Sequence, residues 1–588
     1  MCPVLCRYAL RLSLLTGDGC GPGTERIMEK WYMSAKRADF QAISKKFGID
    51  PVIARVMRNR GIVGDEAIRM YLYGDLSDLN DPFLFKDMDK AVKIIREKIR
   101  ERQYIRVIGD YDIDGIMSSY ILRRGLTELG GYVDIKIPDR VTDGYGINEK
   151  LIREAKADGV DTIITCDNGI SAGRQIALGK ELGMTMIVTD HHEVLELPEA
   201  CDCVIDAKQK DCPYPYKELC GAGVAWKLIL ALGGDPEYKM LPYAAFATVG
   251  DIVDLTGENR ILVKEGLARM KDADSLGFRK LAAECGVDLR TMDAYHIGFV
   301  MGPCLNASGR LDTAMRAARL LETSDVLEAE RLAHELKELN DSRKSLTEIG
   351  VEQAVAFVEE SGMAKDKIFV IYQPELHESL AGIVAGRIRE RYAHPVFVLT
   401  RGEEGIKGSG RSVEAYHMFE GLCGVKDLLT KFGGHPMAAG LTLPEENIEA
   451  FRNRLNEQCT LSDEEFCEKI VVDVPMPVGY VTEELVSELS LLAPFGKANE
   501  KPVFAEKNAV ITSPRIVGKN RNVLKARVTS SQESGYGVQG PVEMVSFHDT
   551  EALMERISRD SRMTIAYYPR INEYLGRKTL QIVVSHWN

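Results

Sequence analysis

Residues 104–115 read YIRVIGDYDIDG, a short β-rich run that ends in three acidic residues, Asp110, Asp112 and Asp114. Helical stretches such as 118–131 separate several runs of this kind along the chain. Four further runs end in or close to acidic or histidine residues: 133–139, 161–169, 184–192 and 201–207. Strands that alternate with helices form a parallel sheet with crossover connections. The sequence therefore predicts an α/β fold whose first large domain is built on a parallel sheet.

The acidic and histidine residues at these strand ends are expected to meet at one edge of the sheet, where ligands of parallel sheets bind. Together with two aspartates of the segment TVGDIVDL, they are Asp110, Asp112, Asp114, Asp167, Asp190, His191, His192, Asp251 and Asp254. A spacing of two residues places Asp110, Asp112 and Asp114 on one side of an extended chain. Like charges crowd there unless a cation binds between them.

A mixed set of carboxylates and imidazoles favours Mn²⁺ or Mg²⁺ as the cofactor, and the imidazoles favour Mn²⁺ over Ca²⁺. The ligands fall into four clusters, in the segments GDYDIDG, TCDNG, TDHH and TVGDIVDL. Four clusters offer more ligands than one ion uses, so we expect two ions about 3.5–4 Å apart, an arrangement that hydrolyses phosphate esters. An aspartate at a strand end is often only a helix N-cap. Capping alone does not explain four successive clusters, one of which contains adjacent histidines.

Four cysteines close together in the sequence form a competing metal site, which would bind zinc. They are Cys201, Cys203, Cys212 and Cys220. Their spacing lacks the paired CxxC of structural zinc sites. We interpret them as buried or incidental thiols.

Composition limits the class of protein. A chain of 588 residues, 45% hydrophobic and 28% charged, is a folded globular protein of about three or four domains. Its net charge of −13 restricts any nucleic-acid binding to a local surface. Thirteen irregularly spaced cysteines indicate reduced thiols and a cytoplasmic location. Charged residues interrupt every apolar run before the roughly 18 residues of a membrane span, so no membrane partner is expected.

The pattern along the chain predicts five segments. Residues 1–27 match neither a signal peptide nor the sequence that follows, and Met28 and Met33 are alternative starts. The stretch after Thr313 is rich in Leu, Ala and Glu and predicts a long helix, or two in tandem. We expect a disordered or mis-started extension at 1–33, a catalytic domain with a helical N-terminal part at 34–313, a connecting helix at 314–362, a smaller α/β domain at 363–460 and a strand-rich barrel at 461–588.

The motifs GDYDIDG, DRVTDGYGIN, TCDNG, TDHH and TVGDIVDL, in this order, resemble those of the DHH phosphoesterase superfamily, and within it those of the single-strand-specific exonucleases. The resemblance continues through GPCLNASGRLDTA, LHESLAGIVAGRI, GSGRS and FGGHPMAAGLTL, which are similar to the DHH-associated domain and the approach to it. LAPFGKANEKPVF resembles the entry to an OB-type domain, the family's nucleic-acid-binding barrel. The similarity runs from about Met28 to the C-terminus.

The resemblance implies roles for individual residues. The metal ligands would be Asp112, Asp114, Asp167, His191 and Asp251. Asp167 would bridge the two ions and His192 would face the scissile phosphate, while Asp110 and Asp190 are either further ligands or partners that orient the ligands. The substrate would lie against Asn306 and Arg310 on one wall of a cleft and Arg411, Ser412 and His435 on the other. Tyr145 is either a core residue or a ring that stacks on a base.

Two positions depart from the family pattern. Ile108 stands where many members have a histidine, which removes a potential ligand of one ion. Cys304 stands where many have an arginine, which removes a positive charge near the nucleic-acid path.

The implied reaction is stepwise 5′→3′ release of mononucleotides from single-stranded DNA in repair and recombination, by a monomer that works with a helicase and a single-strand-binding protein. One alternative is a hydrolase of short oligonucleotides or cyclic dinucleotides, and another is a non-catalytic single-strand-binding scaffold. A local run of positive charge, opposed only by Glu506, favours a strand-tracking surface over the small-substrate hydrolase. This run comprises Lys507, Arg515, Lys519, Arg521, Lys525 and Arg527.

Overall fold

The computed structural model describes residues 29–588 apart from 141, 403–404, 519–520, 532–539 and 575. The described residues divide into two compact units. The terminal unit contains residues from both ends of the chain, 29–73, 467–495 and 499–588. The central unit contains residues 74–466 and 496–498.

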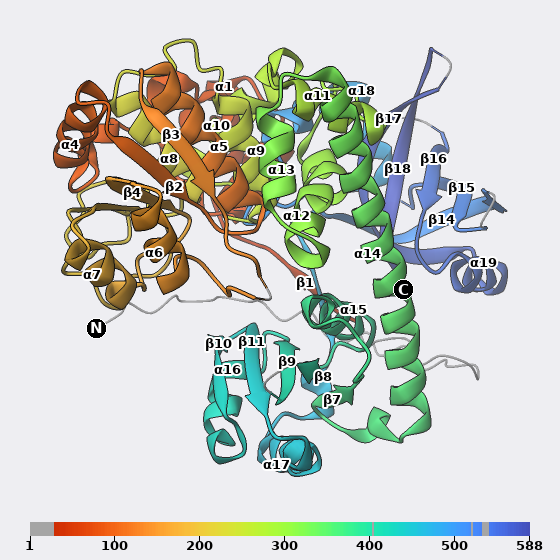
Figure 1. Cartoon of the computed structure of the whole chain (residues 1–588). Helices are drawn as coiled ribbons and strands as arrows, with labels where there is room; N and C mark the ends of the chain where they lie inside the picture. Colours follow the sequence, from red (N-terminus) through yellow and green to blue (C-terminus); the bar gives the residue numbers. More distant parts are fainter. Residues whose placement is uncertain (1–28, 141, 403–404, 519–520, 532–539, 575) are drawn as a thin grey trace. The chain divides into compact units, whose positions relative to one another are not determined.

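A sheet of five parallel strands organises the first part of the central unit, in the order β3-β2-β4-β5-β6 (Figure 1). The strands are β2 Tyr104–Ile108, β3 Tyr132–Lys136, β4 Thr162–Cys166, β5 Thr185–Thr189 and β6 Cys203–Ile205. β4 is buried at every position, as expected for a parallel strand with both faces covered. The predicted α/β fold with a parallel sheet is confirmed.

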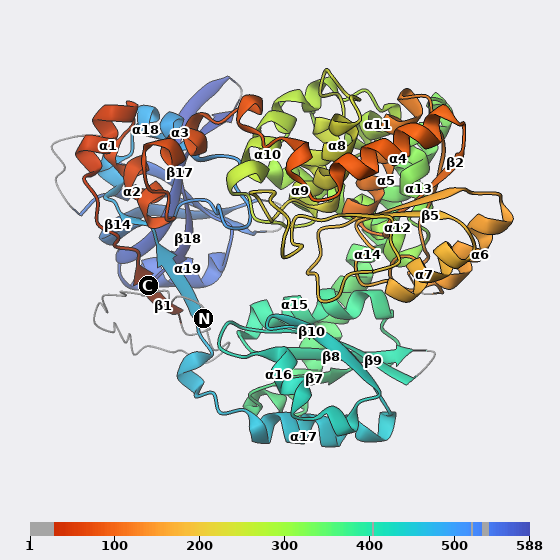
Figure 2. The same ribbon diagram turned by 90° about the vertical axis from the view of Figure 1, so that its left-hand side faces the viewer.

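Helices cover both faces of this sheet (Figure 2). Ile105 and Val107 of β2 pack with α4, α5 and α8 in one hydrophobic cluster. Ile108 of the same strand packs with α6 and α7 in another. The helices are α4 Met88–Arg100, α5 Ile113–Glu128, α6 Glu149–Ala157, α7 Gly173–Glu181 and α8 Gly221–Ala231.

The strand order reverses next to β2. The chain passes from β2 to β3 on one side and then returns to β4 on the other side of β2. In open α/β sheets, such a reversal leaves a crevice at the carboxyl ends of the two strands that flank it. The acidic segment that follows β2 and the segment that follows β4 therefore begin at this crevice.

The remaining helices of the central unit lead to a second domain. Among them are α9 Leu241–Gly250, α10 Gly257–Arg269, α11 Leu276–Glu284, the π-helix η4 His296–Met301, α12 Gly302–Leu311, α13 Met315–Glu322 and α14 Val326–Glu360. The 35-residue helix α14 occupies most of the predicted connecting segment, and Figure 1 shows it running on to the second sheet. Despite this length, neither α14 nor another helix in the described ranges is long and apolar enough to cross a membrane.

The second domain is built on a mixed sheet in the order β10-β11-β9-β8-β7, in which only β7 and β8 pair in parallel. Its elements are β7 Phe369–Tyr372, α15 Ala381–Tyr392, β8 Val396–Gly402, β9 Gly405–Arg411, α16 Met418–Cys423, β10 Lys431–His435, β11 Ala438–Leu443 and α17 Ile448–Gln458. This arrangement confirms the expected smaller α/β domain.

The two Gly-rich segments of this domain, GSGRS at 408–412 and FGGHPMAAG at 432–440, lie largely in strands β9, β10 and β11, although glycine is typical of turns. A Cβ atom at Gly408 would lie 2.5 Å from Cδ2 of Leu399, and one at Gly410 would lie 2.4 Å from Sδ of Met418. The glycines of β9 therefore make room for neighbouring core side chains. Such close packing against a neighbouring strand and helix is not visible in the sequence pattern of the strand itself.

A closed barrel forms the C-terminal part of the terminal unit. Its five strands pair in the order β14-β15-β16-β18-β17, and β17 pairs again with β14. The elements are β12 Glu468–Val472, β13 Val474–Pro475, α18 Glu483–Leu489, β14 Phe504–Val517, β15 Val523–Thr529, β16 Val542–Ser546, α19 Thr550–Arg559, β17 Arg562–Tyr574 and β18 Arg577–Trp587. The expected strand-rich barrel is confirmed.

The beginning of the described chain belongs with this barrel rather than with the first large domain. Strand β1, Glu29–Met33, pairs in parallel with β12. α2 and α3 contribute Ile53, Val56, Ile68 and Leu72 to the hydrophobic cluster of the barrel. The first helices are α1 Phe40–Phe47, α2 Pro51–Asn59 and α3 Asp65–Tyr73.

Two sequence-based boundaries are corrected by this arrangement. The expectation of an extension through residue 33 is wrong for 29–33, which are a strand, and its remainder falls on 1–28, outside the described residues. The helical pattern of residues 34–73 predicts that they join the catalytic domain. Their apolar faces are instead buried against the barrel, more than 400 residues away in the sequence.

Removing β1 should therefore loosen β12. A chain that starts at residue 34 should lose about 2–4 kcal/mol of stability in the terminal unit, at about 1 kcal/mol for each lost ladder hydrogen bond. Amide hydrogen exchange of 468–472 should become faster than in a matched chain that starts at Glu29. Equal protection of these amides in both chains would show that β1 contributes nothing.

Candidate functional site

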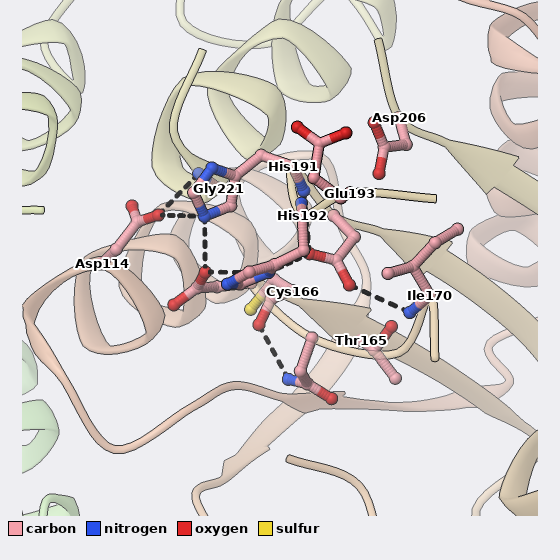
Figure 3. A network of polar contacts seen from close by, with 12 residues as sticks. Asp114, Thr165, Cys166, Ile170, His191, His192, Glu193, Asp206 and Gly221 are labelled. Atoms are coloured by element: carbon pink, nitrogen blue, oxygen red, sulfur yellow. Dashed lines mark hydrogen bonds and ion pairs between the residues drawn. The ribbon is translucent and has the colours of Figure 1, made fainter. Parts of the chain in front are cut away.

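The carboxyl ends of β2, β4 and β5 and the end of α9 bring the predicted acidic and histidine residues together. His191 lies at the centre of this group (Figure 3). Its Nε2 atom is 3.0 Å from Oδ1 of Asp167, 3.6 Å from Oδ2 of Asp114 and 3.8 Å from Oδ2 of Asp251. Three strand ends and one helix end thus converge on a single imidazole.

These residues form three overlapping groups, each with ligand atoms within 4.8 Å of one another. Asp167 belongs to two of the groups, and His191 also belongs to two. The groups are Asp110, Asp112 and Asp167; Asp167, His191 and His192; and Asp114, His191 and Asp251. The mixture of carboxylate and imidazole donors fits Mn²⁺ or Mg²⁺, and the overlap fits two neighbouring ions.

The loop after β2 is held in place by its own backbone. Oδ1 of Asp112 accepts the N–H groups of Asp114 and Gly115 at 2.9 and 3.2 Å, so Asp112 caps α5 as well as belonging to a ligand group. A Cβ atom at Gly115 would lie 2.3 Å from the carbonyl oxygen of Asp110. Glycine at 115 is therefore required for the loop to fold back over the strand end.

Asp114 is oriented by the start of α8, an interaction that the sequence analysis missed. Its carboxylate accepts the N–H of Gly221 at 2.6 Å and the N–H of Ala222 at 2.8 Å. The free N–H groups and the dipole of a helix N-terminus favour a negative charge. A Cβ at Gly221 would come within 2.8 Å of Cβ of Asp167, so the short GAG run at 221–223 was the available signal.

Burial and mutual repulsion raise the pKa values of the carboxyl groups in the metal-free protein. Burial, followed by the charge of Asp112, raises the pKa of Asp110 to about 7 and that of Asp114 to about 6. Burial and the charges of Asp114 and Asp112 raise the pKa of Asp251 to about 8 and hold that of Asp167 well above its usual range. Oδ1 of Asp110 is buried and has no hydrogen-bond partner among the described residues. This charge pattern fits a site completed by cations.

Asp190 and His192 form a hydrogen-bonded pair at the edge of the cluster. Oδ1 of Asp190 lies 2.7 Å from Nδ1 of His192, while Oδ2 accepts the N–H of Ile170 at 2.9 Å. Although burial opposes both ionised forms, the hydrogen bond holds the pKa of Asp190 below its usual value and raises that of His192 to about 9. In the metal-free protein His192 is therefore a cation at the edge of the cluster, and its hydrogen bond with Asp190 supports an orienting role for Asp190.

Burial, then the positive charge of His192, lowers the pKa of His191 to about 3. The central imidazole is thus neutral at physiological pH, the form in which histidine binds a metal. Tyr145 donates its hydroxyl to the carbonyl oxygen of Asp167 at 2.9 Å, and it remains exposed. The structure therefore places Tyr145 at the site rather than in the core.

The residues expected to contact substrate differ in their surroundings. Oδ1 of Asn306 accepts the N–H of Ile113 at 2.8 Å, so Asn306 fixes the strand-end loop. Ser412 is buried and its hydroxyl donates to the carbonyl oxygen of Tyr416 at 2.7 Å. His435 is exposed at the end of β10.

Two predicted arginines lie near a cavity of about 410 Å³. Arg310 donates to the carbonyl oxygen of Ser379, which lines the cavity, at 3.0 Å. Burial and the charges of Arg140 and Arg343 lower the pKa of Arg310 to about 10. Arg411 donates to the carbonyl oxygen of Gly410 at 2.8 Å, and burial also lowers its pKa. Clustered cations of this kind attract an anion.

Three further cations that the sequence analysis did not single out line the same cavity. They are Arg140, Lys407 and Lys431, accompanied by Tyr111, Ser379, Ser409 and Glu378, whose Oε2 lies 2.7 Å from Nζ of Lys407. Arg140 lies over the ring of Tyr111, 4.8 Å from its centroid. Arg140 and Tyr111 follow strands of the first sheet, whereas Lys407 and Lys431 lie in strands of the second sheet. The cavity therefore has one wall from each domain of the central unit.

Other candidates lie away from the cluster. Asp254 is in none of the three ligand groups, and its Oδ1 lies 3.2 Å from Nζ of Lys497. Ile108 and Cys304, the two residues that depart from the family pattern, are both buried. Sγ of Cys304 lies 3.7 Å from Sγ of Cys285. The four cysteines considered for zinc are buried or half-buried, and none belongs to a potential metal group within the described ranges.

Three family patterns match the chain in sequence order. The DHH family, N-terminal domain, matches residues 104–250, the DHHA1 domain matches 365–461 and the RecJ OB domain matches 472–586. The candidate metal-binding residues from Asp110 to His192 lie inside the first match, and most of the barrel lies inside the third.

Whole proteins show the same similarity. The chain is 37% identical to the single-stranded-DNA-specific exonuclease RecJ of Bacillus subtilis over 93% of its own length and 69% of that protein. It is 32% identical to the protein of the same name from Escherichia coli, covering 92% of this chain and 96% of that one. The crystal structure of Thermus thermophilus RecJ with Mn²⁺ superposes with a TM-score of 0.80 at 28% identity, over 95% of this chain and 80% of that one. A Mg²⁺ complex of the Thermus thermophilus protein has also been solved.

Metal-free protein should become less stable as pH rises from about 4 to about 8. The folded state keeps protons on Asp114, Asp110 and Asp251 up to pH values of about 6, 7 and 8, whereas the unfolded chain releases them near pH 4. The folded state therefore binds more protons in this window, and deprotonation costs stability. Replacing Asp251 with Asn should reduce the loss of stability in the upper part of this pH range.

Thermal unfolding in the presence of EDTA, at several pH values, measures this effect for the parent and Asp251→Asn. Added Mn²⁺ should stabilise the parent most at the alkaline end, since metal binding requires deprotonated ligands. Parallel stability curves for the two proteins would contradict the assigned repulsion.

Proposed function

The chain belongs to the RecJ family of single-stranded-DNA-specific exonucleases, and from this premise we propose that it removes mononucleotides from single-stranded DNA in the 5′→3′ direction. The observation that carries the proposal is the convergence of Asp and His ligands at the sheet reversal, within a chain similar to RecJ over nine-tenths of its length. We assign the chemistry to this cluster.

Two Mn²⁺ or Mg²⁺ ions fit the cluster. We infer that Asp112, Asp114, Asp167, His191 and Asp251 would hold them, and that Asp167, the carboxylate common to two of the groups, would be shared. The buried oxygen of Asp110 supports its inclusion as a further ligand. When bound, such ions activate a water molecule and offset negative charge on the phosphate.

The protein's own groups orient the reacting phosphate. His192, held as a cation by Asp190, is placed to donate a hydrogen bond to a phosphoryl oxygen at the edge of the cluster. Gly221 and Ala222 keep the Asp114 carboxylate turned toward the ligand group. Their role is to hold a ligand in its reactive orientation before the substrate arrives.

The cavity beside the cluster supports a defined polarity. We place the 5′ end of the strand in it, because Arg140, Lys407 and Lys431 outnumber Glu378, the partner of Lys407, in the lining of a space of about 410 Å³, and this net positive lining complements a terminal phosphate. Arg310 and Arg411 add charge from opposite domains. A cavity with one wall in each domain then admits the end of a strand, and the metal cluster cuts the first phosphodiester bond.

The barrel supports long single strands as substrates rather than short oligonucleotides or cyclic dinucleotides. Glu506, the one acidic residue of the basic run, is buried and accepts the N–H of Val478 at 2.6 Å, so it does not offset the surface charge. Lys519 lies outside the described residues. The other cations of the run are exposed or half-buried on and between β14 and β15: Lys507, Arg515, Arg521, Lys525 and Arg527. A basic barrel surface of this kind tracks a DNA backbone.

We also infer the cellular setting from the family. The protein would act in the cytoplasm as a monomer in DNA repair and recombination, on strands supplied by a helicase and covered by a single-strand-binding protein. The free cysteines among the described residues are consistent with a reducing compartment. The intact ligand cluster opposes the alternative of a non-catalytic scaffold, since a scaffold has no need for mutually repelling carboxylates.

Replacing Asp167 with Ala should lower the rate of Mn²⁺-dependent hydrolysis by at least about a thousandfold, because loss of a shared ligand disrupts both ions. Asp254→Asn serves as a matched control, because it removes a nearby carboxylate outside the ligand groups, and it should keep activity close to that of the parent. Labelled oligonucleotides that are single-stranded, blunt-ended or blocked at the 5′ end provide the measurement. Equal cleavage of free and blocked 5′ ends by the parent would exclude the proposed polarity.

Removing three charges of the barrel should weaken binding of long single strands and make it less sensitive to salt. The triple variant Arg515→Ala, Lys525→Ala and Arg527→Ala should reduce the slope of log affinity against log salt by about 2, at about 0.7 for each lost phosphate contact. Cleavage of very short strands should change little. A matched control removes three exposed cations of the central unit: Lys156, Arg174 and Lys271.

An unchanged salt slope in the barrel variant, or an equal change in the control, would show that the barrel surface does not track DNA. It would also favour the short-substrate alternative.

A further inference from the structure

Two large aromatic side chains project from the central unit without a packing partner in its core. Tyr295 is 60% exposed and Phe299 is 67% exposed. Their rings stack on one another, with centroids 5.2 Å apart and an interplanar angle of 25°. Such exposure of two adjacent rings is costly in water unless they serve an interaction.

The local structure keeps this pair on the surface. Phe299 lies in η4, a π-helix, and Tyr295 immediately precedes it. Ile297 and Met301 of the same element are fully buried, so they supply its packing while the two rings face away. The N–H of His296 donates to Oδ1 of Asp293 at 3.1 Å, which anchors the first turn. Single π-helical turns are frequent at functional sites.

The aromatic pair is continuous with the metal site through α12, which follows η4 directly. A Cβ at Gly302 would lie 3.1 Å from Cδ1 of Ile113, and a Cβ at Gly309 would lie 2.1 Å from the carbonyl oxygen of Tyr111. Asn306 binds the N–H of Ile113 between these two positions. The helix is therefore pressed against the loop that carries the metal ligands.

Phe299 and Tyr295 precede Gly302 by three and seven residues. At a helical rise of about 1.5 Å per residue, they lie roughly 5–10 Å along the axis beyond the contact with Ile113. A strand whose first phosphodiester bond sits in the metal cluster can reach this distance within a few nucleotides. The flat faces of the two rings suit nucleobases, which stack on aromatic side chains whatever their identity.

We propose that Tyr295 and Phe299 form a stacking platform for bases of the substrate strand, a few nucleotides to the 3′ side of the scissile bond. The inference rests on the proposed function and specifies a positioning element for it. Stacking at this point holds the strand in line with the metal cluster while the 5′ end is cut, and it requires unpaired bases. The platform thus contributes to the selection of single strands.

A scan with abasic sites tests the platform directly. A short 5′-phosphorylated oligonucleotide receives one abasic site, moved one position at a time, and binding to the full chain is measured by fluorescence anisotropy in EDTA, so that hydrolysis does not interfere. The parent should lose about tenfold in affinity at one or two adjacent positions. Phe299→Ala should lose a similar factor on the intact strand and show no further loss at those positions.

Conservative and matched variants separate stacking from structural damage. Phe299→Trp should retain both the affinity and the position-dependent loss. Tyr132→Ala is the control, since Tyr132 is 61% exposed on β3 and its ring packs 4.5 Å from that of Tyr104. This variant should keep the parental abasic profile, and thermal unfolding of all variants should match the parent.

Other outcomes would overturn the inference. A flat abasic profile in a parent that degrades single strands would exclude the platform but leave the proposed function intact, whereas absence of degradation by the parent would exclude the function itself. Persistence of the position-dependent loss in Phe299→Ala would assign the stacking to other residues. A change in oligomeric state with an unchanged profile would identify the pair as a contact between copies of the chain.

Discussion

The crowding of carboxylates at one edge of the central sheet is the constraint on which the site depends. Asp110, Asp112, Asp114 and Asp167 follow two adjacent strands, and their charges oppose one another. Groups that are fixed by the fold offset this repulsion. N–H groups at the start of α8 hold Asp114, and a neutral His191 sits at the centre of the cluster. Bound cations complete an arrangement that the backbone has already fixed.

Positive charge is also concentrated locally, at the cavity beside the carboxylate cluster. The chain carries a net charge of −13, yet the cavity beside the cluster is lined by cations, and burial with Arg140 and Arg343 lowers the pKa of Arg310. A concave surface with a net positive lining concentrates a negatively charged ligand even when the whole molecule carries a negative charge. The acidic overall charge therefore limits nonspecific adhesion to nucleic acid while the cavity retains its attraction.

The sequence predicted those parts of the molecule that depend on local patterns. Alternating strands and helices identified the parallel sheet, and the residues after each strand identified most of the ligand cluster, because the ends of parallel strands must meet. Gly221 and Ala222 escaped notice because their role depends on a carboxylate more than 100 residues earlier. The packing role of Gly408 and Gly410 was not predicted, because the side chains that fill the space beside them come from other segments. Ser412 matched a substrate-binding motif but is engaged inside its domain.

The pairing of β1 with β12 also bears on how the chain acquires its structure during synthesis. Strand β1 and helices α1–α3 are synthesised about 400 residues before their partners in the barrel. At a synthesis rate of about 5–20 residues per second, the apolar faces of these helices stay uncovered for roughly 20–80 seconds until the barrel is made. The central unit is complete by then, apart from residues 496–498. The terminal unit is thus completed after the central unit although some of its residues are made earlier, and during this interval the exposed faces of α1–α3 are a target for chaperones.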